Sequence, residues 1–167
     1  MVATAIIALL WVSLQPSYAR SVEVTIKVAD ADARETARPS WTRVHKRKQM
    51  TRLRIVRRAR SLLGVPYVFG GTGRRGVDCS GLTRYAYQAA GIALPHLAAA
   101  QARMGRWISK RRLRPGDLVV FNRGGHVAMY VGDGYVIAAS SARGRVFRQP
   151  LDDEWLAVEY DQARRLV

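Results

Sequence analysis

The sequence predicts an α+β fold in which helices come first along the chain and an antiparallel sheet follows. Two observations lead to this prediction. Residues 50–63 and 79–89 place apolar side chains at helical spacing. Residues 118–139 instead contain short apolar runs separated by glycine-containing turns, which is typical of an antiparallel meander. With 167 residues, the chain is long enough for one domain with a buried core.

The first part of the chain, residues 1–19, is expected to be a secretory signal peptide. An apolar run covers residues 3–14, and Ser17-Tyr18-Ala19 provides the small residues of a cleavage site. The run is short for a membrane span, and no Lys or Arg precedes it. A retained anchor, an upstream start and a buried N-terminal helix are the other interpretations.

Residues 20–48 are expected to form an N-terminal strand, at 22–28, and a basic linker. Ten Lys or Arg and no acidic residue lie between positions 38 and 60. This stretch is either an electrostatic clamp for an anionic polymer or a solvated helix face behind a flexible basic arm. Its second half is amphipathic and should end at Gly64. The apolar face of that helix comprises Ile55, Val56, Ala59, Leu62 and Leu63. Residues 49–167 are assigned to a catalytic domain.

The charge balance favours a polyanionic partner. The chain has 28 Lys and Arg against 12 Asp and Glu, a formal charge of +16 and a pI near 11.2. Anionic cell-wall polymers, lipid headgroups and nucleic acid all fit this charge. Nucleic acid is not expected, because neither aromatic stacking platforms nor a known recognition module is found. Because the chain has one cysteine, it has no intrachain disulfide. Its three histidines and single cysteine show no metal-ligand spacing, so we expect no metal site and no other cofactor.

The only cysteine, Cys79, lies in a glycine-rich segment that runs from Pro66 to Leu82. Helical spacing follows it directly, so Cys79 is expected at the start of a helix that Asp78 or Ser80 would cap. The partial positive charge of a helix N-terminus favours a thiolate, which is the nucleophilic form of cysteine. A lone cysteine is also often only a small buried apolar residue.

The second candidate is His126, at the start of a predicted strand. Strands are predicted at 118–121, 126–131, 135–139 and 145–148, and the segment from Trp155 to Tyr160 is expected to close the sheet. A cysteine at a helix start and a histidine at a strand start suit a nucleophile and its general base.

Four motifs in this order resemble the NlpC/P60 family of papain-like cell-wall cysteine peptidases, and most closely its actinobacterial, Rip-type peptidoglycan endopeptidase domains. They are Tyr67-Val-Phe-Gly-Gly, Asp78-Cys-Ser-Gly, Leu113-Arg-Pro-Gly-Asp-Leu-Val-Val-Phe and His126-Val-Ala-Met-Tyr-Val-Gly. The resemblance covers about residues 50–160. It implies a papain-like fold, with helices packed on an antiparallel sheet, and cleavage of stem peptides between D-glutamate and diaminopimelate or at a similar linkage.

The resemblance also implies roles for single residues. Cys79 would be the nucleophile and His126 the general base, while Tyr67 would line the site and help to hold the substrate or the oxyanion. Asp78 and Ser80 would shape the loop. The third polar residue of the family falls on Ala138, which cannot orient an imidazole. Ser140, on the same strand face, is the candidate substitute, and Asp133 is a weaker one. His45 and His96 are interpreted as surface or loop histidines.

The resulting hypothesis is a secreted, wall-associated endopeptidase that acts on peptidoglycan stem peptides and is attracted to anionic wall polymers. No stable membrane insertion is expected after signal cleavage, and residues 20–48 would be placed to control the site. The first alternative is a catalytically degenerate protein that binds peptidoglycan without cutting it. A basic protein that binds nucleic acid or a membrane surface is the second alternative, and it rests on net charge alone.

Overall fold

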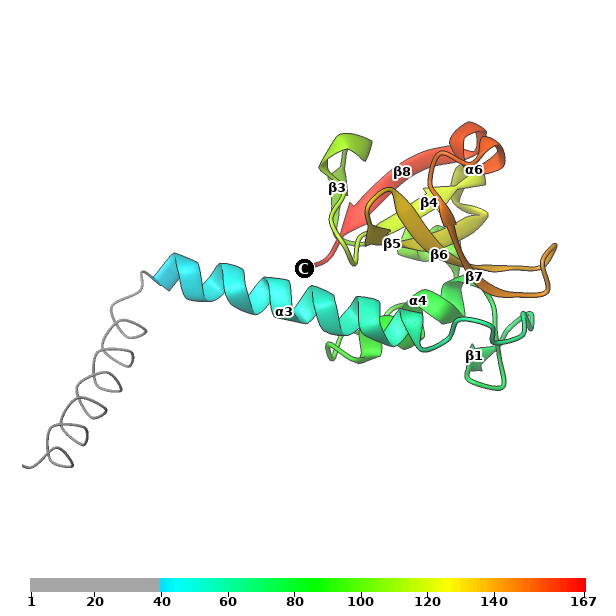
Figure 1. Cartoon of the computed structure of the whole chain (residues 1–167), viewed down its shortest axis with the longest axis horizontal. Helices are drawn as coiled ribbons and strands as arrows, with labels where there is room; N and C mark the ends of the chain where they lie inside the picture. The colour runs from blue at the N-terminus through cyan, green and yellow to red at the C-terminus, as the bar shows by residue number, and fades with distance from the viewer. Residues whose placement is uncertain (1–39) are drawn as a thin grey trace, which may run out of the picture. The chain divides into compact units, whose positions relative to one another are not determined.

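The computed structural model describes residues 40–167, so the expected signal peptide and the strand expected at 22–28 lie outside the described residues. Residues 46–167 form one unit. Figure 1 shows the elements, whose bounds in chain order are α3 Ser40–Arg60, β1 Thr72–Gly73, β2 Gly76–Val77, α4 Cys79–Gln88, α5 Ala98–Gln101, β3 Arg106–Ile108, η1 Lys110–Arg112, β4 Leu118–Phe121, η2 Asn122–Gly124, β5 His126–Gly132, β6 Tyr135–Ser140, β7 Arg145–Pro150, α6 Glu154–Val158 and β8 Tyr160–Arg165.

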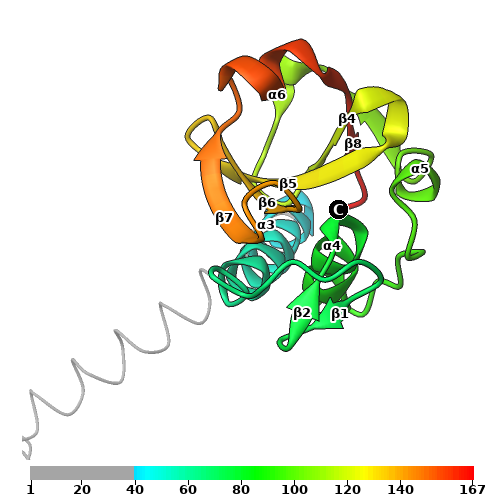
Figure 2. The same cartoon turned by 90° about the vertical axis from the view of Figure 1, so that its right-hand side faces the viewer.

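A six-stranded antiparallel sheet with the order β3-β8-β4-β5-β6-β7 is the centre of this unit. β1 and β2 form a separate small hairpin. Figure 2 shows α4 and the C-terminal half of α3 on one side of the sheet and α6 on the other. The predicted α+β class is therefore confirmed, because helices pack against an antiparallel meander.

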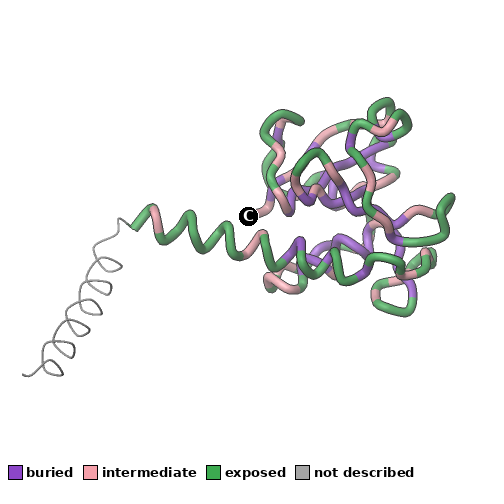
Figure 3. Tube along the Cα trace, in the orientation of Figure 1, coloured by how far each residue is buried: buried purple, intermediate pink, exposed green. Residues whose placement is uncertain are grey.

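Both faces of the sheet are buried, each in its own cluster. Figure 3 shows buried residues concentrated along the strands and the helices that cover them. On the helix side, Leu118, Val120 and Met129 pack against apolar residues of α3 and α4. On the opposite side the cluster comprises Val119, Phe121, Ala128, Val136, Ala138, Leu151 and Leu156. This alternation along β4 and β5 follows from the period of two of a strand. It places the side chain of His126 on the second face, with Ala128 and Ala138.

The amphipathic helix predicted at 50–63 forms, but it is longer at its start and shorter at its end. It begins at Ser40, inside the stretch expected to be a linker. Its buried residues are Ile55, Val56 and Ala59, and Leu62 is buried in the turn that follows. The prediction was wrong for Leu63, which is 44% exposed, because the helix has already ended at Arg60. Gly64 has a φ of +82°, which suits the glycine expected at this helix end.

The C-terminal segment differs from the prediction. Trp155–Tyr160 was expected as the closing strand, but α6 takes most of it and buries Leu156. The strand is instead β8, which lies between β3 and β4. Its sequence is mostly polar and gave no strand signal. β8 is held by a buried ion pair, in which the Arg165 guanidinium donates to both carboxylate oxygens of Asp117 at 2.7 and 2.6 Å. Within residues 40–167, no helix has the length and apolar character needed to cross a bilayer.

Candidate active site

Cys79 is the first residue of α4, as the sequence predicts. Asp78 is the N-cap, in an extended conformation, and its Oδ1 accepts the N–H of Gly81 at 2.7 Å. Two glycines allow the preceding loop to pack against this turn. A Cβ at Gly81 would lie 2.1 Å from the carbonyl oxygen of Gly71, and a Cβ at Gly71 would lie 2.5 Å from that of Gly76. Larger residues would therefore push the loop away from the cysteine.

The carboxylate of Asp78 organises the surroundings of Cys79. Besides Gly81, it accepts the N–H of Gly70 at 2.9 Å and the hydroxyl of Ser80 at 3.0 Å. The ring Nε2 of His96 lies 3.0 and 2.9 Å from its two oxygens. Burial by itself would raise the pKa of Asp78, but the hydrogen bonds from Gly81, His96, Ser80 and Gly70 outweigh it and lower that pKa. The group therefore remains a carboxylate that joins the loop to the helix start.

His96 lies in a loop between α4 and α5, as expected, and its ring contacts the buried Asp78, which the sequence did not indicate. The fully buried Gln101 holds this loop, since its Nε2 donates to the carbonyl oxygens of Ser80 and Pro95 at 2.9 and 2.8 Å. Asp78 could have indicated this contact in advance, because a buried carboxylate at a helix start needs hydrogen-bond donors, and His96 can supply one.

The thiol of Cys79 is half-buried, at the junction of α4 and β5. Burial raises its pKa, and the charge of Asp78 acts in the same direction. The N–H of Val127 and the amides of Ser80 and of Cys79 itself oppose this rise by donating toward the sulfur. The helix start therefore favours the thiolate, as expected, but burial outweighs it and the net shift favours the thiol.

His126 is the first residue of β5 and pairs with Phe121 of β4. Its ring centroid lies 5.9 Å from that of Phe121 and 6.0 Å from that of Trp155. Burial lowers the pKa of His126, so the neutral form is favoured. Throughout the described residues, no side-chain hydrogen bond to the imidazole is found. The ring is therefore held by aromatic contacts instead of by a polar partner.

The structure brings Cys79 to the start of β5, where the general base was predicted. The amide that points to the sulfur belongs to Val127, the residue directly after His126. In the described part of the chain, no hydrogen bond joins the thiol and the imidazole directly. Both pKa shifts favour a neutral thiol and a neutral imidazole, so the pair is not a preformed ion pair.

Tyr67 also lies at this site. Its backbone pairs with Val77 in a parallel bridge, and its N–H donates to the carbonyl oxygen of Gly144 at 2.8 Å. Burial raises the pKa of its phenol, and Cys79, when ionised, and the carboxylate of Asp78 raise it further. The phenol therefore stays protonated and can donate a hydrogen bond near the sulfur.

Ala138, where the resemblance led us to expect the family's third polar residue, is packed among apolar residues. Ala138 is 1% exposed and shares its cluster with Ala128, on the face to which His126 belongs. The β5–β6 pairing ends at Met129 and Ile137 and does not reach His126. Ser140 uses its hydroxyl oxygen to accept the N–H of Arg143 at 3.2 Å. Its role as a substitute third group therefore stays a prediction.

Residues 40–167 contain no group of three or more His, Cys, Asp or Glu side chains arranged to hold a metal ion. The chemistry available at this site is thus that of a thiol, an imidazole, a phenol and the amides at a helix start. These are the groups of covalent acyl transfer.

A sequence profile of the NlpC/P60 family matches residues 64–165. The chain belongs to the NlpC/P60 family. The match begins at the glycine that ends the first turn after α3 and runs to the last residue of β8, so it includes Cys79, His96 and His126.

Relatives agree with this assignment. The probable endopeptidase NlpC homolog of Haemophilus influenzae is 39% identical over 106 residues, which are 63% of this chain and 57% of that protein. The gamma-D-glutamyl-L-lysine dipeptidyl-peptidase of Bacillus cereus is 38% identical over 119 residues, which are 68% of this chain and 36% of that protein. The chain therefore spans only part of the length of these curated relatives.

Solved structures of the family have the same fold. The peptidoglycan hydrolase RipB of Mycobacterium tuberculosis matches with a TM-score of 0.63 and 30% identity, over 70% of this chain and 65% of that one. An NlpC/P60 family protein from Bacillus cereus matches with a TM-score of 0.65 and 37% identity, over 68% and 39% of the two chains. The resemblance to Rip-type peptidoglycan endopeptidases is therefore confirmed.

Proposed function

We propose that this protein is a peptidoglycan endopeptidase in which Cys79 is the nucleophile and His126 the general base. The observation that carries the proposal is the position of the Cys79 sulfur. It lies at the first turn of α4, with the N–H of Val127, the neighbour of His126, directed toward it. Relatives named as an endopeptidase, a dipeptidyl-peptidase and a peptidoglycan hydrolase support it.

In the proposed mechanism the pair starts neutral. As the sulfur attacks the scissile carbonyl carbon, the imidazole of His126 takes the thiol proton. The imidazolium then protonates the leaving amine when the C–N bond breaks and a thioester forms on Cys79. Water, activated by the now neutral His126, hydrolyses the thioester and returns the free thiol. The lowered pKa of His126 keeps it in the proton-accepting form at neutral pH.

The negative oxygen of the tetrahedral intermediate needs donors that are already in place. The backbone N–H of Cys79 at the helix start and the protonated phenol of Tyr67 are the proposed donors. Asp78 and Ser80 act indirectly, because their hydrogen bonds hold the glycine loop and the helix start in position. Ser140 is kept as the candidate third group.

The proposed substrate is the stem peptide of peptidoglycan, cut at a D-glutamyl–diaminopimelate type of bond. One relative is named for a gamma-D-glutamyl-L-lysine linkage, which has the same D-glutamyl donor side. Secretion through residues 1–19, location in the wall and attraction to anionic wall polymers belong to the same proposal. The formal charge of +16 supports the last of these, since it would concentrate the protein on an anionic wall.

The second candidate is a degenerate protein that binds peptidoglycan without cutting it. Two features favour a protein that binds without cutting. His126 has no polar side-chain partner among residues 40–167, and Ala138 cannot orient an imidazole. A catalytic triad whose third member is removed can lose about four orders of magnitude in turnover.

A digestion separates the two candidates. The full chain and its Cys79→Ala variant are incubated with diaminopimelate-type sacculi and with soluble muropeptides, and the products are read by mass spectrometry. New stem-peptide fragments from the unmodified chain alone are expected, and their masses identify the bond. If neither protein releases fragments while both sediment with sacculi, the endopeptidase proposal is wrong and the binding protein remains.

A further inference from the structure

Among residues 40–167, His96 is the one hydrogen-bond partner of the Asp78 carboxylate that comes from outside the glycine-rich segment Pro66–Leu82. Its ring Nε2 lies 3.0 and 2.9 Å from the two carboxylate oxygens. A carboxylate only accepts hydrogen bonds, so Nε2 carries a hydrogen in this contact. The side chains of His96 and Asp78 are 21% and 10% exposed. Solvent therefore screens the contact only in part.

Gln101 of α5 fixes the loop that carries His96. Its side chain is fully buried, and its Nε2 donates to the carbonyl oxygen of Pro95, the residue before His96, at 2.8 Å and to that of Ser80 at 2.9 Å. Its Oε1 accepts the hydroxyl of Thr83 in α4 at 2.6 Å. One buried amide thus ties the His96 loop to the start of α4, so the ring is held against Asp78 by more than its own contact.

The charge of Asp78 acts on the Cys79 thiol. The titratable groups of the elements packed around this thiol are Asp78, Tyr67 in the preceding loop and His126 at the start of β5. Burial is the main cause of the raised pKa of Cys79, and the charge of Asp78 adds to it. The phenol of Tyr67 stays protonated, and burial favours the neutral form of His126. Of these three groups, Asp78 alone therefore opposes the thiolate by its charge.

We propose that His96 is a positioning residue that sets the reactivity of Cys79 through Asp78. A hydrogen bond donated to a carboxylate is charge-assisted and draws negative charge toward the donor. The His96 contact therefore weakens the repulsion between Asp78 and the thiolate that forms next to it. A fixed cation at position 96 would weaken this repulsion further, and loss of the donor would strengthen it.

The test measures the thiol without a substrate. The full chain has one cysteine, so mass spectrometry reports alkylation by iodoacetamide at Cys79 alone. Alkylation rates are measured between pH 5 and 10 for the unmodified chain, for His96→Ala, which removes the donor, and for His96→Arg, which supplies a permanent cation. The midpoint of each profile follows the ionisation of the thiol. Thermal denaturation shows whether each variant is folded.

We expect His96→Ala to be alkylated about threefold more slowly than the unmodified chain at pH 7. Less of the thiol is then ionised, and the greater basicity of its thiolate offsets only part of this loss. The midpoint of the profile should move to higher pH. In His96→Arg the rate at pH 7 should rise about threefold, and the midpoint should move to lower pH. A purely structural role of His96 would lower the rate in both variants and leave the midpoint in place.

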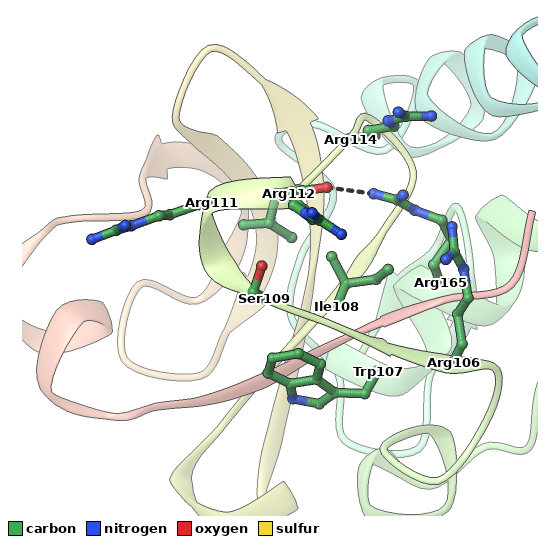
Figure 4. A pocket seen from close by; sticks show the side chains of 9 residues that line it. Arg106, Trp107, Ile108, Ser109, Arg111, Arg112, Arg114 and Arg165 are labelled. Carbon is green, nitrogen blue, oxygen red and sulfur yellow. Dashed lines mark hydrogen bonds between the residues drawn. The ribbon is translucent and has the colours of Figure 1, made fainter.

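Two controls separate this contact from net charge. His45→Ala and His45→Arg make the same changes at an exposed position of α3. Arg106→Gln removes a whole charge from the basic hollow beside β3, which Figure 4 shows. The residues that line this hollow come from β3, η1, the loop that leads into β4, and β8, and none of them belongs to α4 or to the His96 loop. All three controls should keep the profile of the unmodified chain.

Two results would overturn the proposal. One is a midpoint that stays in place in His96→Arg, which decides the question even if His96→Ala fails to fold. The other is an equal displacement of the midpoint in the controls, which would mean that only net charge matters.

Only the consequence for peptide cleavage rests on the proposed function. If alkylation follows the expected order but the unmodified chain releases no fragments from sacculi, the endopeptidase proposal fails and the role of His96 stands. If fragments are released and the midpoints do not move, the role of His96 is wrong and the endopeptidase proposal stands.

Discussion

Cys79 and His126, the two proposed catalytic residues, are held in place by different forces. The cysteine follows Asp78, whose carboxylate is hydrogen-bonded to Gly81, Gly70, Ser80 and His96. The histidine has aromatic rings of Phe121 and Trp155 around it and no polar partner in the described chain. Hydrogen bonds fix direction as well as distance, whereas ring contacts restrict an imidazole mainly by exclusion. We therefore expect changes near Cys79 to alter stability and changes near His126 to alter the chemical step.

The largest effect is expected from His126→Ala. Loss of the general base should lower kcat on muropeptides by about 10²–10⁴-fold, with little change in melting temperature. Mass-spectrometric rates and a thermal melt measure the two quantities. A variant that keeps more than about a third of the activity would show that another group takes the thiol proton.

Asp78→Ala should act mainly on stability. It removes the N-cap and leaves several donors without an acceptor, which should lower the free energy of unfolding by about 2–4 kcal/mol. Chemical denaturation measures this difference. Asp78→Asn is the matched control, because it keeps one carbonyl oxygen for the Gly81 N–H and should lose less. Equal losses in the two variants would contradict the assigned network.

The same residue predicts how stability depends on pH. The folded pKa of Asp78 lies below its ordinary value of 3.8, so its contribution is present above pH 3.8. It is lost as the pH falls from there through the lower folded pKa. Denaturation curves between pH 2 and 6 should show a smaller acid-induced loss in Asp78→Asn than in the unmodified chain. An unchanged loss would mean that other carboxylates cause the acid sensitivity.

Trp155→Ala should test the aromatic contacts that hold His126. We expect kcat to fall about tenfold, because the imidazole ring can then adopt more orientations. Removing the ring also hydrates His126. Its pKa, now lowered by burial from an ordinary 6.5, should then rise. Since the neutral imidazole is the active base, the acidic limb of the kcat/KM profile should move to higher pH. Trp155→Phe should restore both values, and an unmoved limb would show that Trp155 does not shield the base.

Ser140→Ala should have the smallest effect. The Ser140 hydroxyl accepts the Arg143 amide and makes no hydrogen bond to His126, so we expect kcat to change by less than about threefold. Steady-state rates on muropeptides measure it, with Ser141→Ala as a neighbouring control. A loss of tenfold or more would instead identify Ser140 as the third group, acting directly or through water.

Local sequence patterns were sufficient to predict much of the secondary structure of this protein. The helix start at Cys79, its Asp78 cap, the strands β4 to β7 and the glycine turn at Gly64 after α3 follow from spacing, capping residues and turn glycines within a few positions of one another. Each of these features depends on neighbours in the chain, so a single sequence contains the signal. Ala138 was marked in advance only by the resemblance to the family, which places a third polar residue at that position.

Tertiary structure decided the features that join distant positions. His96 reaches Asp78 across 18 positions, β8 inserts between β3 and β4, and Trp155 packs on His126. No local sequence pattern predicts these three contacts. Each depends on which surfaces remain exposed once the sheet has formed. The mostly polar strand β8 pairs along its backbone with β3 and β4, and Asp117 provides the partner that the buried Arg165 guanidinium needs.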